Sequence, residues 1–418
     1  MSKLTSKNSA TFPDMDILQV VPNRVHPPDT GGDHRKHGLM DAFVTAGDNV
    51  IRYCQGGDPS DYLSRELETW IDIESGYREV RVNHLFHDLA SVTVLFDFPY
   101  VYLGPTLKRV PTETLLNELE RADVVFVEGP WQVSAVDSLL DDGLLVYSSH
   151  NYEPERFSTF ASGTCVHRYF YEKVEAAERD AVSSADLVVC TSERDMEIYR
   201  REFEDVDIYV APNGTYVDED PTVNTDQNQQ IRDELDVGDD ESLGLFVGSK
   251  HTPNIEALRL IHDIASDVDS EGTHLVAVGT ACDDVDRQSS NVEQLGFVED
   301  IEPYFEAADF AVHPMVSGGG TNIKLFDYFN WGLPVISTEF GARGLDVTDN
   351  HNIIISEIEG FPESIRRLHR HPDLREDIGN AAREFVREKY DWREISRKLR
   401  EKMLTYVNNS EREDSITD

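Results

Sequence analysis

Short apolar runs of strand length alternate with amphipathic segments of helix length through most of the chain. This alternation is typical of repeated strand–helix units that build parallel sheets, so the pattern predicts an α/β fold. In the first half, we expect strands at the apolar runs 17–21, 49–54, 92–96, 124–128, 144–148, 187–191 and 208–211. In the second half, we expect them at 243–247, 274–279, 291–295, 310–314, 334–338 and 352–355.

The two series of strands are separated by residues 218–230, which are rich in Asp, Asn, Gln and Thr and almost free of apolar side chains. Such a composition is typical of a linker or loop. A chain of 418 residues is also about twice the usual length of one domain. The sequence therefore predicts two domains, each with its own sheet.

The last part of the chain has a different pattern, because residues 361–407 carry only helical periodicity and the residues after 408 are polar. We therefore expect no further strand there. The predicted organisation is an N-terminal domain at 1–216, joined by a C-terminal helix at about 390–407, a second domain at 217–389, and a disordered tail at 408–418.

The composition is strongly acidic, with 80 Asp and Glu against 38 Lys and Arg, a net charge of −42, and only 10 lysines. In molar salt the Debye length falls to about 3 Å, so that the self-repulsion of such a chain is screened. We expect a halophilic source. The same charge argues against a nucleic-acid partner, because binding to phosphates requires clustered Lys and Arg.

No apolar run approaches the roughly 18 residues that a membrane span requires, and residues 1–16 lack the apolar core of a leader. We expect a cytoplasmic protein and leave open a peripheral place at the inner face of the membrane. The four cysteines lie far apart, and the histidines show no ligand spacing, so neither a disulfide framework nor a metal site is expected.

Two glycine loops carry the candidate chemistry, and the first follows the strand at 17–21. Gly31 and Gly32 stand just before a helical run that begins at His34. Paired glycines let a backbone approach a ligand closely, and a helix start offers free amides to an oxygen-rich partner. An ordinary tight turn remains the alternative, and the third glycine of a dinucleotide fingerprint is missing.

The second loop, residues 317–327, has the sequence SGGGTNIKLFD and is followed by GLPVIST. Its three glycines and Thr321 would leave unobstructed amides at the start of a helix, where the dipole favours a diphosphate. Lys324 adds a positive charge, and Asp327 lies three residues later on the same face, where it could accept ribose hydroxyls. The alternative is a surface ion pair on a glycine-started helix.

The segment 318–336 resembles the donor-site motif of family 4 glycosyltransferases of the GT-B fold. Other segments resemble that family in the same order: PDTGG at 28–32, PNG at 212–214, FVGS at 246–249 with Pro253-Asn254, and LGFV at 295–298. The resemblance implies two Rossmann-like domains that face a central cleft, with C-terminal helices that cross back. It also implies that the second domain holds a nucleotide sugar.

The resemblance assigns roles to individual residues. Lys250 and Lys324 would neutralise the leaving diphosphate, and His150, after the strand at 144–148, would face the donor sugar; we treat these three as catalytic. A structural histidine at a strand end is the alternative for His150. The residues implied to bind the donor are Gly31, Gly32, Gly248, Ser249, Gly319, Gly320, Thr321, Asn322 and Asp327.

The chain departs from the family at two positions, because two glutamates eight residues apart are usual there and this sequence has Gly319 and Asp327. Asp is one methylene shorter than Glu, and the loss of the first carboxylate removes a group near the sugar. Glu128, at the end of the strand 124–128, is a further candidate, because ligands of parallel sheets gather at the carboxyl ends of strands.

We therefore expect a retaining glycosyltransferase that moves a sugar from a nucleoside-diphosphate sugar to a carbohydrate or lipid-linked acceptor, in surface-polysaccharide or glycan assembly. No cofactor is expected besides the donor substrate. Two alternatives stay open: a nucleotide-sugar epimerase of the same fold, and a catalytically silent member that binds sugar nucleotides.

Overall fold

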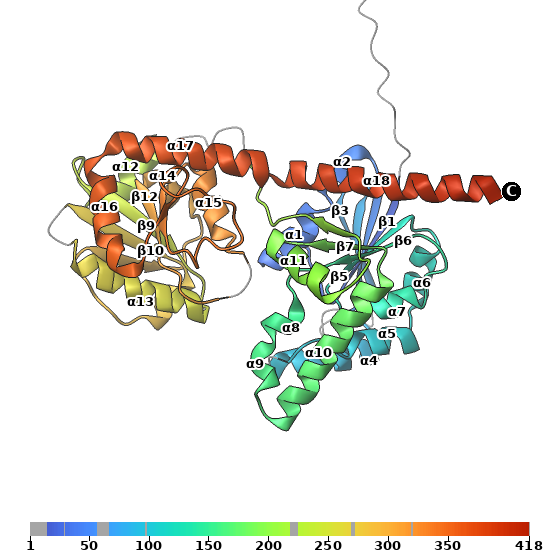
Figure 1. Cartoon of the computed structure of the whole chain (residues 1–418). Coiled ribbons are helices and arrows are strands. Elements are labelled where there is room, and N and C mark those ends of the chain that lie inside the picture. The colour runs from blue at the N-terminus through green and yellow to red at the C-terminus, as the bar shows by residue number, and fades with distance from the viewer. Residues whose placement is uncertain are drawn as a thin grey trace, which may run out of the picture. The chain divides into compact units, whose positions relative to one another are not determined.

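The structure is a computed structural model that describes residues 15–28, 30–56, 67–96, 98–217, 225–268, 272–318 and 321–417. The chain divides into two compact units (Figure 1). Unit 1 comprises Met1–Pro212 and Ser396–Asp418, and unit 2 comprises Asn213–Ile395. Each unit has a largely parallel sheet with helices on both faces, which confirms the α/β, Rossmann-like fold class.

The sheet of unit 1 has eight strands in the order β3-β4-β2-β1-β5-β6-β7-β8. Every pairing is parallel except that of β3 with β4. The central strands are apolar on both faces because helices cover both faces of the sheet. Their bounds are β1 Asp16–Val21, β2 Asn49–Cys54, β3 Glu68–Glu74, β4 Tyr77–Val82, β5 Val124–Glu128, β6 Leu144–Ser148, β7 Leu187–Cys190 and β8 Ile208–Val210.

The helices of unit 1 include one of 20 residues, α10, whose N-terminus is capped by Thr164. Side chains of α5, α6, α7, α10 and α11 pack on one face of the sheet. Their bounds, with those of the other helices, are α1 Gly31–Gly38, α2 Asp41–Ala46, α4 Leu85–Ser91, η1 Val92–Phe96, α5 Leu103–Arg109, α6 Glu113–Leu119, α7 Val133–Asp137, α8 Glu153–Arg156, α9 Ser158–Ala161, α10 Cys165–Ser184 and α11 Glu193–Glu202.

Two local predictions for unit 1 are wrong. Residues 92–96 form the 3₁₀ helix η1 instead of a strand, because a short apolar run cannot by itself distinguish the two. The hairpin of β3 and β4 was not expected. Strand β3 lies at the sheet edge and alternates exposed residues, three of them charged and the fourth Trp70, with half-buried ones, so it lacks the continuous apolar run of its neighbours.

The sheet of unit 2 has six parallel strands in the order β11-β10-β9-β12-β13-β14. All six strands expected for this half are confirmed. Alternate residues of β12 enter different clusters: Ala311 packs with α15 and α17, and Phe310 and Val312 pack with α13 and α16. The bounds are β9 Ser242–Val247, β10 Thr273–Val278, β11 Val292–Gly296, β12 Phe310–His313, β13 Val335–Ser337 and β14 Ile354–Ile355.

The first helix of unit 2 corrects the linker prediction, because α12 occupies much of the second half of the expected linker. Its i,i+4 contacts, such as Gln229 with Asp233, support a helix without an apolar stripe of the usual width. The helices of this unit are α12 Thr225–Glu234, α13 Thr252–Ser266, η2 Thr280–Asp284, α14 Glu302–Ala307, α15 Lys324–Asn330, η3 Ile358–Gly360, α16 Phe361–Arg370 and α17 Pro372–Lys389.

The last helix, α18 (Trp392–Thr417), returns the chain to unit 1, as the expected crossing back requires. Ser396 donates its hydroxyl to the Leu39 carbonyl at 2.7 Å and accepts from the Ala42 amide at 2.8 Å. Arg400 makes two bonds to the buried carboxylate of Asp48, at 2.6 and 2.8 Å. The helix continues past residue 408, where a disordered tail was expected, because neither Gly nor Pro interrupts it.

Candidate functional site

The loops at the carboxyl ends of the strands of unit 2 bring the second-half candidates to one edge of the sheet. Gly248 follows β9 and Gly279 follows β10. A Cβ atom at Gly279 would lie 2.3 Å from the Gly248 carbonyl oxygen, and Gly279 has φ of 111°, so only glycine permits this approach. The loop after β9 and the loop after β10 are therefore in close backbone contact, beside the segment that precedes α15.

Lys324, the first residue of α15, is held by one neutral side chain. Its Nζ donates to Oδ1 of Asn254 at 2.7 Å, and the Asn254 amide donates to the Ser249 carbonyl at 2.9 Å. Burial lowers the pKa of Lys324 to about 8, although the nearby Asp327 opposes this shift. At neutral pH Lys324 is therefore a partly desolvated cation without an ion-pair partner in the described part of the chain.

Asp327 lies one turn further along α15 and has solvent-exposed surface, although its surroundings desolvate the carboxyl enough to raise its pKa to about 6, against the pull of Lys324. Asn322 is already engaged, because its amide donates to Nε2 of His313 at 2.7 Å. His313 ends β12 and is buried, and burial lowers its pKa to about 3, so its ring is a neutral acceptor. Thr321 packs against Gly344, where a Cβ would lie 2.8 Å from its hydroxyl oxygen. The structure thus gives Thr321 and Asn322 a part in shaping the loop.

The helix after the glycine loop begins later than expected. Helix α15 starts at Lys324, with Ile323 as its N-cap and no side-chain cap, whereas the sequence predicts a start at the glycines. Gly319 and Gly320 lie outside the described residues, so their contact with a diphosphate stays a prediction. Gly318 has φ of 127°, a conformation that glycine adopts without strain.

Lys250 is placed differently from Lys324. Its ammonium group pairs with Asp284 at 2.9 Å, and its side chain is 64% exposed. The pairing raises the pKa of Lys250. The structure therefore joins Ser249, Asn254 and Lys324 in one hydrogen-bonded chain, and leaves the side chain of Lys250 outside it.

In unit 1, the structure brings Gly32 and His150 together. Gly31 and Gly32 open α1, which Thr30 caps in a reciprocal pair with Asp33. A Cβ at Gly32 would lie 3.6 Å from Nδ1 of His150, so the ring of this histidine faces the start of α1. His150 follows β6, whose carboxyl end lies at the same edge of the sheet as that of β1.

The imidazole of His150 is oriented by a buried carboxylate. Its Nε2 lies 2.7 Å from Oε2 of Glu128, whose other oxygen accepts from the Gln19 amide at 2.7 Å. Burial raises the pKa of Glu128, but the hydrogen bonds from His150 and Gln19 outweigh it and bring the pKa to about 2. Burial lowers the pKa of His150 against the pull of Glu128. A neutral ring must then donate from Nε2, which leaves the lone pair of Nδ1 toward Gly32.

A second buried network, which the sequence analysis missed, holds the loop after β1. Arg52 donates to the Gln19 side chain at 2.8 Å and pairs with Glu79 at 3.2 Å. Glu79 also pairs with Arg81 at 2.7 Å and accepts from the His26 amide at 2.9 Å. The sequence does carry a signal for this network, because Arg52 stands within the apolar strand β2. The structure buries it fully, and a buried charge requires a partner.

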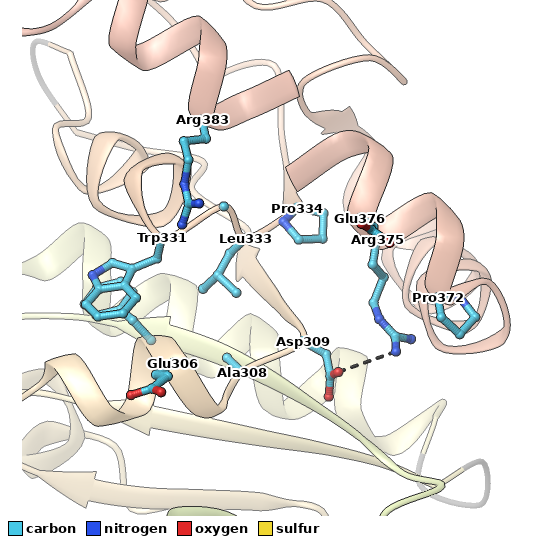
Figure 2. A pocket seen from close by; sticks show the side chains of 12 residues that line it. Glu306, Ala308, Asp309, Trp331, Leu333, Pro334, Pro372, Arg375, Glu376 and Arg383 are labelled. Carbon is cyan, nitrogen blue, oxygen red and sulfur yellow. Dashed lines mark ion pairs between the residues drawn. The ribbon is translucent and has the colours of Figure 1, made fainter. Parts of the chain in front are cut away.

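The cavity in Figure 2 belongs to the opposite edge of the unit 2 sheet. Its volume is about 330 Å³, and its lining includes Asp309 and Pro334, which precede β12 and β13. Arg375 of α17 pairs there with Asp309 at 3.4 Å. Trp331, just after the last turn of α15, also lines it, whereas Lys324 lies at the first. The cavity is therefore separate from the candidate site.

The described residues contain no group of three or more His, Cys, Asp or Glu arranged to hold a metal ion. Among the helices described, none combines the length and the apolar character that crossing a membrane requires.

Comparison with known proteins gives a family match for part of the chain and a fold match for nearly all of it. Residues 241–371 match the model of the family described as glycosyl transferases group 1. No curated protein sequence matches the chain. The matched residues include Ser249, Asn254 and Lys324, which form the hydrogen-bonded chain described above.

Three solved structures represent the likeness in fold. Sucrose-phosphate synthase (tll1590) from Thermosynechococcus elongatus has a TM-score of 0.68 at 16% identity, over 94% of this chain and 99% of that one. Anabaena Alr3699/HepE in complex with UDP has a TM-score of 0.67 at 14% identity, over 94% and 100%. WaaG, a glycosyltransferase involved in lipopolysaccharide biosynthesis, has a TM-score of 0.61 at 16% identity, over 92% and 98%.

At these identities the structural likeness establishes the fold. The chain has the GT-B fold of solved glycosyltransferases, and its residues 241–371 match the family model described as glycosyl transferases group 1.

Proposed function

We propose that the protein is a retaining glycosyltransferase that uses a nucleoside-diphosphate sugar as donor. The observation that carries this proposal is Lys324, a partly desolvated cation in the matched domain whose Nζ is bonded to the neutral Asn254 side chain. A partly buried cation whose hydrogen bond goes to a neutral group attracts an anionic ligand strongly, because water screens it poorly. A diphosphate supplies the matching charge.

The roles of the unit 2 residues follow from the chemistry of the transfer. When the bond between the anomeric carbon and the diphosphate breaks, negative charge develops on the departing phosphate. A cation already held in place stabilises that charge without reorganising in the transition state. We assign this role to Lys324, with Lys250 in support, and ribose binding to the exposed carboxylate of Asp327. Gly248, Ser249, Gly319 and Gly320 would approach the diphosphate through their backbone.

In unit 1, we assign His150 to the donor sugar. Its neutral ring, with Nε2 fixed by Glu128, presents Nδ1 as a hydrogen-bond acceptor toward the side of Gly32. A hydroxyl of the sugar is a suitable donor for that lone pair. Glu128 and Gln19 are then positioning residues, and Gly31 and Gly32 leave room for the ligand.

We further propose a carbohydrate or lipid-linked acceptor, in surface-polysaccharide or glycan assembly. Lys324 would supply the positive charge that a metal ion supplies in other transferases, so no cofactor besides the donor is required. The acidic composition supports a halophilic source and a salt-rich cytoplasm. We also propose a peripheral place at the inner face of the membrane.

The test is a screen of nucleoside diphosphates and their sugars in molar KCl, read first as a shift in melting temperature and then as transfer to saccharide acceptors. UDP and UDP-glucose head the panel because Alr3699/HepE was solved with both. A ligand that binds only the native state raises the melting temperature. Turnover that persists in EDTA is expected. A panel that produces neither a shift nor turnover would contradict the proposal.

A second candidate function is a catalytically silent protein that binds sugar nucleotides. Gly319 and Asp327, which stand where glutamates are usual, favour it. Binding without donor hydrolysis or transfer would identify this case. A sugar that changes its configuration without any acceptor would instead identify a nucleotide-sugar epimerase.

A further inference from the structure

Helix α4 and the following η1 carry an apolar face on the outside of unit 1. The face consists of Leu85, Phe86, Leu89, Val92 and Phe96, which are 60%, 58%, 58%, 41% and 69% exposed. Four of these residues are spaced by four, three and four positions, so they lie along one side of the helical segment. We call this set the α4 face.

The α4 face inverts the usual arrangement of a surface helix. A helix on a soluble protein normally turns its apolar stripe inward and its polar residues toward water. In α4, the residues turned inward are His87 and Ala90, at 0% and 7% exposure. Contiguous exposed apolar surface of this kind marks an interaction site in a folded protein.

A packed aromatic cluster lies beneath the α4 face. The exposure of these apolar side chains is therefore not a result of poor local packing. Phe98, just after η1, packs against Phe170 of α10 at a ring-centroid distance of 4.5 Å and against Phe160 of α9 at 5.6 Å. Ala90 of α4 belongs to the same buried cluster, with Leu103 of α5. The helices α4, α5, α9 and α10 therefore form one lobe, visible below the sheet of unit 1 in Figure 1.

The charge of this lobe differs from that of the rest of the chain. About one residue in five of the protein is acidic, yet residues 98–112 and 156–171 contain no Asp or Glu at all. Both stretches carry basic residues, and Lys108, Arg109 and Arg168 are exposed. In a chain of net charge −42, these two stretches are free of negative charge, and the acidic residues of the lobe lie outside them, at Asp88 of α4 and from Glu172 onward in α10.

We propose that the α4 face docks on a lipid membrane with anionic headgroups. The five apolar side chains would enter the boundary between headgroups and acyl chains, and Lys108, Arg109 and Arg168 would reach the phosphates. An apolar helical face combined with basic residues is the composition of helices that lie in the membrane interface. The absence of carboxylates from residues 98–112 and 156–171 reduces the repulsion that the rest of this acidic protein would meet at an anionic surface.

Lipid fits this surface better than a second copy of the chain does. A second copy would bring another charge of −42 to the interface, whereas a membrane brings phosphates that the basic residues complement. This inference rests on the place at the membrane proposed above and names the surface that would make the contact. Its test is independent of the catalytic assignment, because binding to vesicles needs neither donor nor acceptor. Insertion of apolar side chains is not screened by salt, so it persists in molar KCl.

The experiment uses flotation of the full chain with vesicles of phosphatidylglycerol and phosphatidylcholine, in molar KCl. We expect the native protein to float, and the variant Phe86→Ser/Leu89→Ser/Phe96→Ser to bind at least about tenfold more weakly. The matched control, Leu116→Ser/Phe297→Ser, removes two exposed apolar side chains elsewhere, at 41% and 75% exposure, and should float like the native protein. Equal flotation of the native protein and the triple variant would overturn the proposal.

Two further measurements guard against a folding defect and against other occupants. In Phe96→Trp, which leaves the face apolar, the tryptophan emission should shift to the blue on addition of anionic vesicles; an unchanged spectrum counts against the proposal. Lys108→Glu/Arg109→Glu should weaken flotation at the lowest KCl at which the protein stays folded, and less in molar KCl. A native dimer that the triple variant loses, without any vesicle binding, would assign the face to a second copy instead.

Discussion

The two units hold their candidate site residues in opposite ways. In unit 1, His150 is bonded to an ionised, buried Glu128, which is bonded to Gln19, and Gln19 in turn to Arg52. In unit 2, Lys324 has a pKa lowered to about 8, and its Nζ is bonded to a neutral amide. The first arrangement joins its charged groups through hydrogen bonds before any ligand arrives, whereas in the second the ammonium group is hydrogen-bonded to a neutral amide and Asp327 acts on it only through space.

The difference indicates which unit supplies orientation and which supplies binding energy. A buried network whose charges are already paired fixes a side chain in one geometry, but it gains little interaction energy when a further charge binds. A desolvated cation whose hydrogen bond goes to a neutral group gains more when an anion arrives. Unit 2 is therefore the expected source of donor affinity, and unit 1 the expected source of precise placement.

The largest expected effect comes from breaking the buried network of unit 1. Glu79→Gln removes the charge that Arg52 and Arg81 share, and leaves two cations uncompensated in the interior. We expect a loss of about 3–5 kcal/mol in the free energy of unfolding. Denaturant unfolding in molar KCl measures it. The matched control is Asp284→Asn, which breaks the exposed pair with Lys250 and should cost less than about 1 kcal/mol.

Next comes the loss of donor affinity in Lys324→Ala. The variant removes a charged hydrogen-bond donor worth about 1.5–3 kcal/mol, so the dissociation constant for a nucleoside diphosphate should rise roughly 10- to 150-fold. Isothermal titration calorimetry measures it. Lys250→Ala, which removes a largely exposed and already paired lysine, should change the constant much less. Equal effects of both substitutions would remove the contrast between the two lysines.

A smaller effect, on turnover, should follow from Glu128→Gln. Gln can present its amide NH₂ to Nε2 of His150, which favours the tautomer that carries the proton on Nδ1. We expect kcat to fall by roughly 10- to 100-fold, while binding of a nucleoside diphosphate stays unchanged. Steady-state kinetics and calorimetry on the same preparation separate the two quantities. A variant that loses binding as well would contradict the division of labour between the units.

The smallest expected effect is the pH dependence of donor binding. Burial lowers the pKa of Lys324 from its ordinary value to about 8, so the lysine is charged below that pH and neutral above it. Affinity for a nucleoside diphosphate should therefore be highest well below pH 8 and should fall as the pH rises through 8. A bound anion raises the pKa, so the complex loses its proton later than the free protein does. Lys324→Arg should flatten the profile, and an equally steep profile in that variant would exclude Lys324 as its cause.

Much of the fold could be predicted because its signals are local. Most of the six strands of unit 2 are short apolar runs between helix-length segments, and all six expected strands are present. Secondary structure was predicted wrongly where the apolar pattern fits both a strand and a helix, or where tertiary contacts decide between them. The apolar run at 92–96 forms η1, and β3 was overlooked because an edge strand with one solvated face carries few apolar residues.

The candidate site could be predicted only in part. The glycines, His150 and Lys324 were found because motif spacing marks them, whereas Asn254 entered only as part of a motif and not as the partner of Lys324. The start of α15 was placed three or more residues too early, because glycines signal a flexible loop as readily as a helix start. Lys250 is expected to contribute less to donor binding because its ammonium group is already paired with Asp284, and no sequence motif indicates this pair.

The sequence by itself determined the α/β class, the division into two sheets, the acidic character and the positions where glycine permits close approach. These properties depend on side-chain type and on periodicity along the chain. Only the tertiary structure decided that Glu128 meets His150 across 22 residues and that Asn254 meets Lys324 across 70. The reason is geometric: strand order and register bring such pairs together, and a hydrogen bond requires atoms within about 3 Å, a precision that periodicity alone does not encode.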